Sequence, residues 1–144
     1  MNKRNKIIRW TFLIGWLIFI FYMSQKNGND SNSLSSNLAN LMKSLGLNVI
    51  SKLDLNYIIR KIAHFSEYFI LYIIVVRVIG IYKNYRQAIK YSILCIFAYA
   101  CLDEFHQLFI NGRSSSFSDV LIDILGGLLA LFVYLLYKKN KIKS

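Results

Sequence analysis

The sequence predicts an all-α protein, a bundle of four transmembrane helices with a short amphipathic helix in the extracytoplasmic loop between the first two. Hydrophobic residues make up 56% of the 144 positions, and proline is absent. The apolar residues fall in long blocks, which is typical of an integral membrane protein. Basic residues flank these blocks. The length suits a single domain, which we assign to residues 1–144.

The strong positive charge raises the question of a nucleic-acid partner, because the formal net charge is +11. However, the Lys and Arg residues flank the apolar blocks and do not form one stripe. Orientation in a membrane and contact with anionic lipid therefore explain the charge better. We expect no nucleic-acid partner. The sequence contains no Gly-rich phosphate-binding loop, so we also expect no bound nucleotide.

The first apolar block, residues 7–23, follows a basic N-terminus. The residues after it offer no convincing small-x-small cleavage site, so we expect a retained signal anchor. A polar run then opens a predicted loop over residues 24–61. Inside that loop, leucines and a methionine recur at helical spacing and predict the short amphipathic helix, on the membrane surface or packed on a neighbouring helix. They are Leu34, Leu38, Leu41, Met42 and Leu45, with Ser33 as N-cap and Gly46 as stop.

Three further apolar blocks predict membrane spans over residues 62–82, 88–110 and 117–137. The last two are separated by a short polar turn, residues 111–116, that contains Gly112. This turn predicts an antiparallel helical hairpin.

The distribution of positive charge predicts the orientation of the spans. With the N-terminus inside, the cytoplasmic flanks hold the larger group of basic residues: Lys3, Arg4, Lys6, Arg9, Lys83, Arg86, Lys90, Lys138, Lys139, Lys141 and Lys143. The other side holds Lys26, Lys43, Lys52, Arg60, Lys61 and Arg113. The positive-inside rule therefore predicts a multi-pass protein of the plasma membrane with both termini in the cytoplasm.

Carboxylates lie inside these apolar segments, where each costs about 2.5–3.5 kcal/mol near the bilayer centre and usually marks a functional site. Of the seven acidic residues, only Asp30 and Asp54 lie outside them. The others are Glu67, Asp103, Glu104, Asp119 and Asp123. In the predicted topology all five lie near the extracytoplasmic boundary, so they can meet. A crowded acidic group of this kind is expected to be proton-sensitive or to bind a cation.

Helical spacing gives each of the last three spans one polar stripe. The stripes are Arg60, His64 and Glu67; Asp103, His106 and Gln107; and Asp119, Asp123 and Gly127. Glu104 sits about 100° from Asp103 around the helix, so only one of the two can point at a shared centre. Gly126 and Gly127 should let the last span approach a neighbour closely.

Three stretches carry recognisable motifs. They are RKIAHFSEYFILYIIV at 60–75, LDEFHQLFINGRSSSFSDVLIDILGG at 102–127 and SQKNGNDSNSLSS at 24–36. Together they resemble, in order and spacing, the VanZ-like family of small membrane proteins. The most specific part is the combination of R-K-x-x-H-F-x-E-Y, D-E-x-H-Q and G-R-x(5)-D-V-L-x-D. The resemblance covers most of the chain.

The resemblance implies a role like that of the family's namesake, which lowers susceptibility to teicoplanin-type lipoglycopeptides without remodelling the peptidoglycan peptide terminus. It also maps the family's polar positions onto Arg60, His64, Glu67, Tyr68, Asp103, Glu104, Gln107, Arg113, Asp119 and Asp123. Two positions depart from the family pattern. Asn111 stands where Pro is frequent, and Asp123 stands where many members have Asn, which adds a charge.

Three interpretations of the polar group stay open. The first is a pocket, rimmed by Arg60, Lys61 and Arg113, for the phosphate head of a membrane lipid or a lipid-linked cell-wall precursor. Its ligand-binding residues would be Arg60, His64, Glu67, Tyr68, Gln107 and Arg113. The second is an enzyme acting by acid–base or divalent-metal chemistry on a lipid-linked phosphate or ester. The third is a buried ion-pair network that only holds the helices together.

For the enzyme interpretation, the candidate catalytic residues are Asp103, Glu104, His106, Asp119 and Asp123. The candidate metal ligands are Asp103, His106, Asp119 and Asp123. An ion pathway is disfavoured because the polar residues gather at one end of the spans and only Arg77 continues toward the other.

Overall fold

The computed structural model describes residues 2–25, 36–37, 40–41, 44, 52–111 and 116–143, and the side chains at 52–56 and 141–143 are left aside. Within these residues the structure has four long helices: α1 (Lys3–Ser24), α3 (Lys52–Ile79), α4 (Tyr85–Gln107) and α5 (Phe117–Lys143). Among the described residues there is no β-strand. The predicted all-α bundle is confirmed.

Three of these helices are long and apolar enough to cross a membrane: Lys3–Ser24, Tyr57–Ile79 and Phe117–Asn140. The protein is therefore a membrane protein. α4 has a similar length but is not among the three, because Arg86 and Lys90 near its start and Asp103 and Glu104 near its end lower its hydropathy. A crossing by α4, and with it the fourth span, stays a prediction.

The helix bounds differ from the predicted spans in two places. α3 begins at Lys52, so residues 52–61, which the sequence analysis placed in the loop, are helical. α4 ends at Gln107, and residues 108–110 form turns where the predicted span continues. Of the predicted amphipathic helix, residues 36–37, 40–41 and 44 are described, each in helical conformation, and the rest lies outside the described residues.

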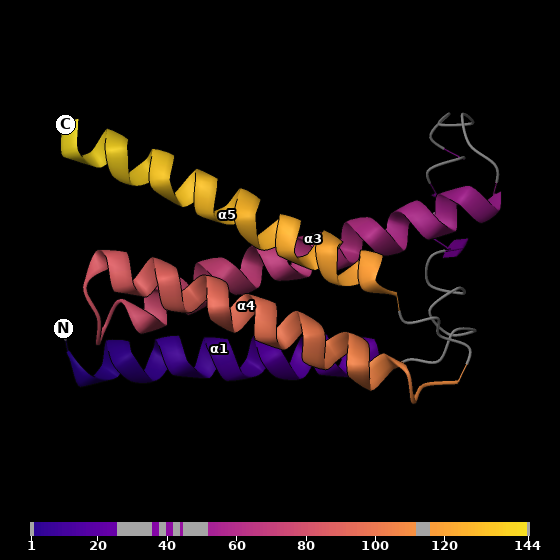
Figure 1. The fold of residues 1–144 in the computed structure, drawn as a ribbon, viewed down its shortest axis with the longest axis horizontal. Helices are drawn as coiled ribbons and strands as arrows, with labels where there is room; N and C mark the ends of the chain where they lie inside the picture. The colour runs from indigo at the N-terminus through magenta and orange to yellow at the C-terminus, as the bar shows by residue number, and fades with distance from the viewer. Residues whose placement is uncertain are drawn as a thin grey trace.

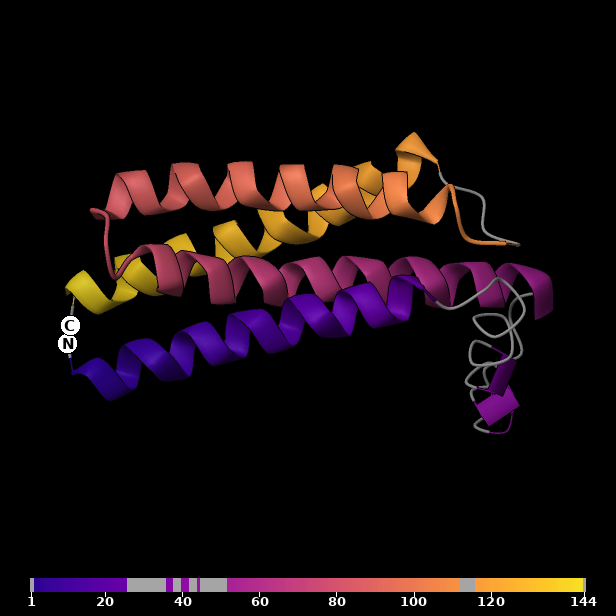
Figure 2. The same cartoon turned by 90° about the horizontal axis from the view of Figure 1, so that it is seen from below.

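α3 occupies the centre of the bundle and contacts α1, α4 and α5, while α4 also packs on α5 and on α1. Figures 1 and 2 show the four helices running roughly along one axis. Both termini lie at the same end of the bundle (Figure 1). We call the opposite end, where α3 and α5 begin and α4 ends, the polar end.

α3 and α5 approach each other closely at a glycine. A Cβ atom added at Gly126 would lie 2.2 Å from the backbone oxygen of Phe65 on α3. At the next position, a Cβ at Gly127 would lie 3.0 Å from Ile96 Cγ2 on α4. Small residues at such crossings let membrane helices pack backbone against backbone. The predicted close approach at Gly126 and Gly127 is confirmed, and it involves both neighbouring helices.

Hydrogen bonds to backbone carbonyls attach α1 to the bundle along its length. Trp16 Nε1 donates to the Glu67 carbonyl at 3.0 Å, and Tyr99 OH donates to the Leu17 carbonyl at 3.0 Å. Near the termini, Arg9 donates to the Arg77 carbonyl at 2.7 Å. An intramembrane donor without such a partner would be costly. α1 therefore forms part of the bundle.

The Gly126 contact predicts that one added methyl group at this position lowers the stability of the protein. Gly126→Ala should lower the free energy of unfolding by about 1–3 kcal/mol, because the new Cβ would press on the backbone of α3, which cannot rotate away. Gly15→Ala is the matched control, since nothing lies within 4 Å of a Cβ there. Thermal unfolding in detergent should show a lower midpoint for Gly126→Ala only. Equal midpoints for the two variants would contradict the close packing.

Candidate functional site

The acidic residues of the apolar helices gather at the polar end of the bundle. Asp103 and Glu104 on α4 are 6% and 4% exposed, and Asp119 and Asp123 on α5 are 8% and 0% exposed. Glu67 on α3 is half-buried. We call these five residues the acidic layer. The helices bring them together because α3 and α5 start, and α4 ends, at the same end of the bundle.

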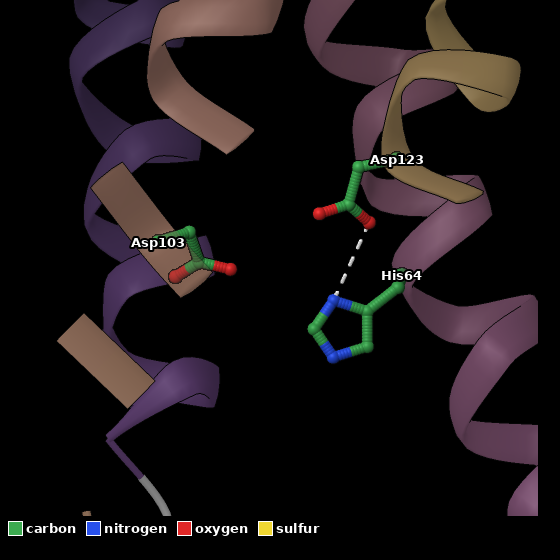
Figure 3. A group of neighbouring side chains, drawn as sticks. All are labelled: His64, Asp103 and Asp123. Atoms are coloured by element: carbon green, nitrogen blue, oxygen red, sulfur yellow. Dashed lines mark ion pairs between the residues drawn. The ribbon is translucent and has the colours of Figure 1, made fainter. Parts of the chain in front are cut away.

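One histidine and two carboxylates form a cluster inside the acidic layer. His64, Asp103 and Asp123 each offer one ligand atom, and these atoms lie within 4.8 Å of one another. His64 Nδ1 lies 3.6 Å from Asp123 Oδ1. Figure 3 shows this pair with the carboxylate of Asp103 directed toward it from α4. We call His64, Asp103 and Asp123 the three-residue cluster. Three different helices build it.

Two further buried groups surround the three-residue cluster. Gln107 Nε2 donates to Asp103 Oδ2 at 3.1 Å and thereby orients that carboxylate. Tyr68, one helical turn after His64, is 0% exposed and lies within electrostatic reach of Asp103 and Asp123. Its hydroxyl has no hydrogen-bond partner within the described ranges. The same holds for both carboxylate oxygens of Asp123. Buried polar atoms of this kind call for an explanation.

Asp119 is paired separately from the cluster. Its carboxylate forms an ion pair with the ammonium group of Lys61 on α3, and the two side chains are 11% and 19% exposed. Lys61 also lies over the ring of Tyr57, with its nitrogen 4.8 Å from the ring centroid. A carboxylate already balanced by a cation has less reason to bind another. This pair matches the structural ion-pair interpretation for Asp119.

Glu104 and His106 are not part of the three-residue cluster. Glu104 Oε2 accepts a hydrogen bond from the backbone N–H of Ser116, just before α5, at 3.1 Å. This agrees with the expectation that only one of Asp103 and Glu104 faces the centre. The ring of His106 stacks on Phe21 of α1, with centroids 5.0 Å apart and planes inclined by 28°. It therefore supports the packing of α1.

The predicted site residues thus fall into several groups. Of the four candidate metal ligands, the structure brings Asp103 and Asp123 together but not His106 or Asp119. His64, assigned from the sequence to ligand binding, supplies the imidazole instead. Arg60 is half-buried on α3, one turn before His64. The predicted role of Arg113 falls on a residue outside the described ranges.

Sequence reasoning missed the aromatic residues around the layer, Trp16, Phe21 and Tyr99. Each sits in an apolar block, where aromatic residues are common and carry no distinguishing signal. Tertiary packing gives them their contacts: Trp16 with the Glu67 carbonyl, Phe21 with His106 and Tyr99 with Tyr68.

A cleft of about 620 Å³ opens between α1, α3 and α4. Its lining is almost wholly apolar and runs from the end of the bundle that holds the termini to the level of the acidic layer. The lining residues are Trp10, Leu13, Leu17, Leu71, Val75, Val78, Ile79, Tyr82, Lys83, Tyr91, Cys95, Ala98, Tyr99 and Leu102. Volumes of roughly 300–1,000 Å³ are typical of small-molecule sites. Leu102 directly precedes Asp103 on α4, so the cleft extends along α4 as far as the turn that carries Asp103, and none of the three cluster residues is part of its lining.

The fold and site define a class of protein: a small helical membrane protein with a buried polar layer at one end of its bundle. Comparison with known families agrees with this class. The sequence model of the VanZ/LLP1 family matches residues 9–138. The chain belongs to the VanZ/LLP1 family. No curated protein and no solved structure matches it.

The ion pair between Lys61 and Asp119 predicts a measurable coupling. Lys61→Met and Asp119→Asn should each destabilise the protein, because each leaves a poorly solvated charge without its partner. The double variant should lose less than the sum, with a coupling of about 0.5–3 kcal/mol. Unfolding of the four proteins in detergent measures it. A control cycle combines Asp119→Asn with Lys139→Met at the exposed far end of α5, where the effects should add. Additivity in both cycles would contradict the pairing.

Proposed function

We propose that the protein binds a membrane lipid or a lipid-linked envelope component in the outer leaflet. The hydrocarbon chain would lie in the cleft between α1, α3 and α4, and the head group would lie at the polar end. The observation that supports the proposal is the position of the cleft, whose lining is almost wholly apolar and extends along α4 to Leu102, the residue before Asp103. A ligand with an apolar chain and a polar head matches both parts.

The charges at the polar end support an anionic head group. Arg60 and Lys61 stand at the start of the membrane-crossing part of α3. A guanidinium group can contact a phosphate through two parallel hydrogen bonds, which suits Arg60 to a phosphate head. Arg113 would complete this rim in the proposal made from the sequence. A lipid phosphate is the group that such cations recognise best in an outer leaflet.

Membership of the family adds a physiological role to the proposal. A protein that holds a lipid or a lipid-linked wall precursor could withhold it from a drug that needs it. We therefore propose that the chain lowers susceptibility to teicoplanin-type lipoglycopeptides, as the family's namesake does. In this proposal the protein sits in the plasma membrane as a multi-pass protein with both termini in the cytoplasm.

A second candidate function is that of an enzyme acting on a lipid-linked phosphate or ester. The three-residue cluster favours it, because an imidazole and two carboxylates can transfer protons or hold a metal. The cleft extends along α4 to Leu102, the residue before Asp103 of the cluster. Turnover of a lipid-linked phosphate by the purified protein, abolished by Asp103→Asn, would distinguish this function from binding alone.

The cleft predicts which substitution blocks lipid binding. Ala98→Trp should fill the cleft from α4 and weaken lipid binding about tenfold or more, because the chain and the indole would occupy the same volume. Ala98 is exposed, so the bundle itself should stay folded. Native mass spectrometry with phosphatidylglycerol measures the bound fraction. Phe132→Trp, at an exposed position on α5, is the control and should bind as the unaltered protein does. Equal binding by both variants would refute the cleft as the lipid site.

The physiological proposal has its own test. Expression of the full chain in a susceptible host should raise the minimum inhibitory concentration of teicoplanin, and Ala98→Trp expressed at the same level should abolish that increase. A glycopeptide without an acyl chain is the matched control and should show a smaller change. If the unaltered chain leaves teicoplanin susceptibility unchanged, the resistance role is wrong, while lipid binding is judged by mass spectrometry alone.

A further inference from the structure

We propose that His64, Asp103 and Asp123 bind a divalent transition-metal ion, Zn²⁺ or Mn²⁺, at the polar end of the bundle. The inference goes beyond the proposed lipid binding and does not depend on it. It rests on the composition of the cluster, the separation of its atoms, the burial of Asp123 and the balance of charge.

The ligand types fit such an ion. An imidazole nitrogen with carboxylate oxygens suits Zn²⁺, Mn²⁺ and related ions, whereas sites for Ca²⁺ and Mg²⁺ use oxygen alone. Three protein ligands leave a coordination position open, as in zinc sites that also bind water or substrate. The three ligands come from α3, α4 and α5, so the ion would tie together the three helices that form the polar end.

The distances between the candidate ligand atoms also fit a bound metal ion. The 3.6 Å between His64 Nδ1 and Asp123 Oδ1 is longer than a hydrogen bond. Two ligands that share a tetrahedral metal with bonds of about 2.0–2.1 Å lie about 3.3 Å apart. All three candidate ligand atoms lie within 4.8 Å of one another, so a short approach of the side chains completes the coordination. Asp103 is already oriented by its hydrogen bond from Gln107.

The carboxylate of Asp123 points independently to a ligand. The residue is 0% exposed, and neither of its oxygens has a hydrogen-bond partner in the part of the chain that the structure describes. Both oxygens lie on the side of α5 that faces His64 and Asp103 (Figure 3). A buried carboxylate normally accepts several hydrogen bonds or coordinates a metal. The carboxylate of Asp123 is therefore available to coordinate a cation.

Charge balance selects a divalent ion over a proton. Asp103 and Asp123 carry two negative charges when ionised. Of the two cations at the start of the membrane-crossing part of α3, Lys61 is paired with Asp119, and among the described residues Arg60 forms no ion pair with either carboxylate. Protonation of His64 would balance one of the two charges. A divalent ion held by neutral His64 balances both, which matters most where water is excluded. The side chain of His64 is 14% exposed, so the cluster is not fully enclosed by the bundle.

Metal binding by the purified full chain tests this proposal. The protein in detergent is stripped with a chelator, and ZnCl₂ or MnCl₂ is then titrated alone by calorimetry, with the bound metal counted by elemental analysis. We expect one ion per chain. Asp123→Asn and His64→Gln should each weaken binding about tenfold or more, because each removes a direct ligand. His106→Gln is the matched control, since His106 stacks on Phe21, and it should bind like the unaltered chain.

A spectroscopic readout keeps the test decisive if one variant folds poorly. Co²⁺ added to the unaltered chain should give visible absorption bands of a four- or five-coordinate site, and His64→Gln should shift or abolish them. The proposal is overturned if the chain binds no stoichiometric ion, or if His106→Gln weakens binding as much as His64→Gln does. Ala98→Trp should keep its metal affinity, so loss of lipid binding and loss of metal binding can be told apart.

Discussion

The close contact between α3 and α5 at Gly126 is the constraint on which the polar end depends. Gly126 packs against the backbone of Phe65, and Phe65 directly follows His64. Asp123 lies about one turn before Gly126 on α5. The contact that brings the two backbones together therefore also brings the imidazole and the carboxylate within 3.6 Å. A side chain at position 126 would separate the helices and the cluster at once.

In this arrangement, the buried carboxylates have different partners. Asp119 pairs with Lys61, and Glu104 accepts a hydrogen bond from the backbone at Ser116. Asp103 accepts one from Gln107. Asp123 lies beside His64 and Asp103, accepts no hydrogen bond from the described residues, and is the most deeply buried of the four. An unbalanced charge is most costly at the most buried position. A carboxylate at position 123 is therefore better explained by function than by a contribution to stability.

Much of this arrangement could be predicted from the sequence. Apolar blocks predict the helices, and the positions of the carboxylates within them predict that they gather at one end. Other features depend on tertiary packing. Spacing puts His106 on a stripe with Asp103, but its ring lies against Phe21 on α1, a contact that no local pattern encodes. The start of α3 at Lys52 was missed because residues 52–61 are too polar to read as part of a span.

Tyr99 shows how the two sites of the polar end can work together. Its hydroxyl group donates to the Leu17 carbonyl, its ring lies 6.2 Å from that of Tyr68, and it also lines the cleft. Tyr68 in turn stands beside the carboxylates of the three-residue cluster. If both proposals hold, this aromatic pair would stand between a lipid chain in the cleft and an ion in the cluster, so that binding of one would not exclude binding of the other.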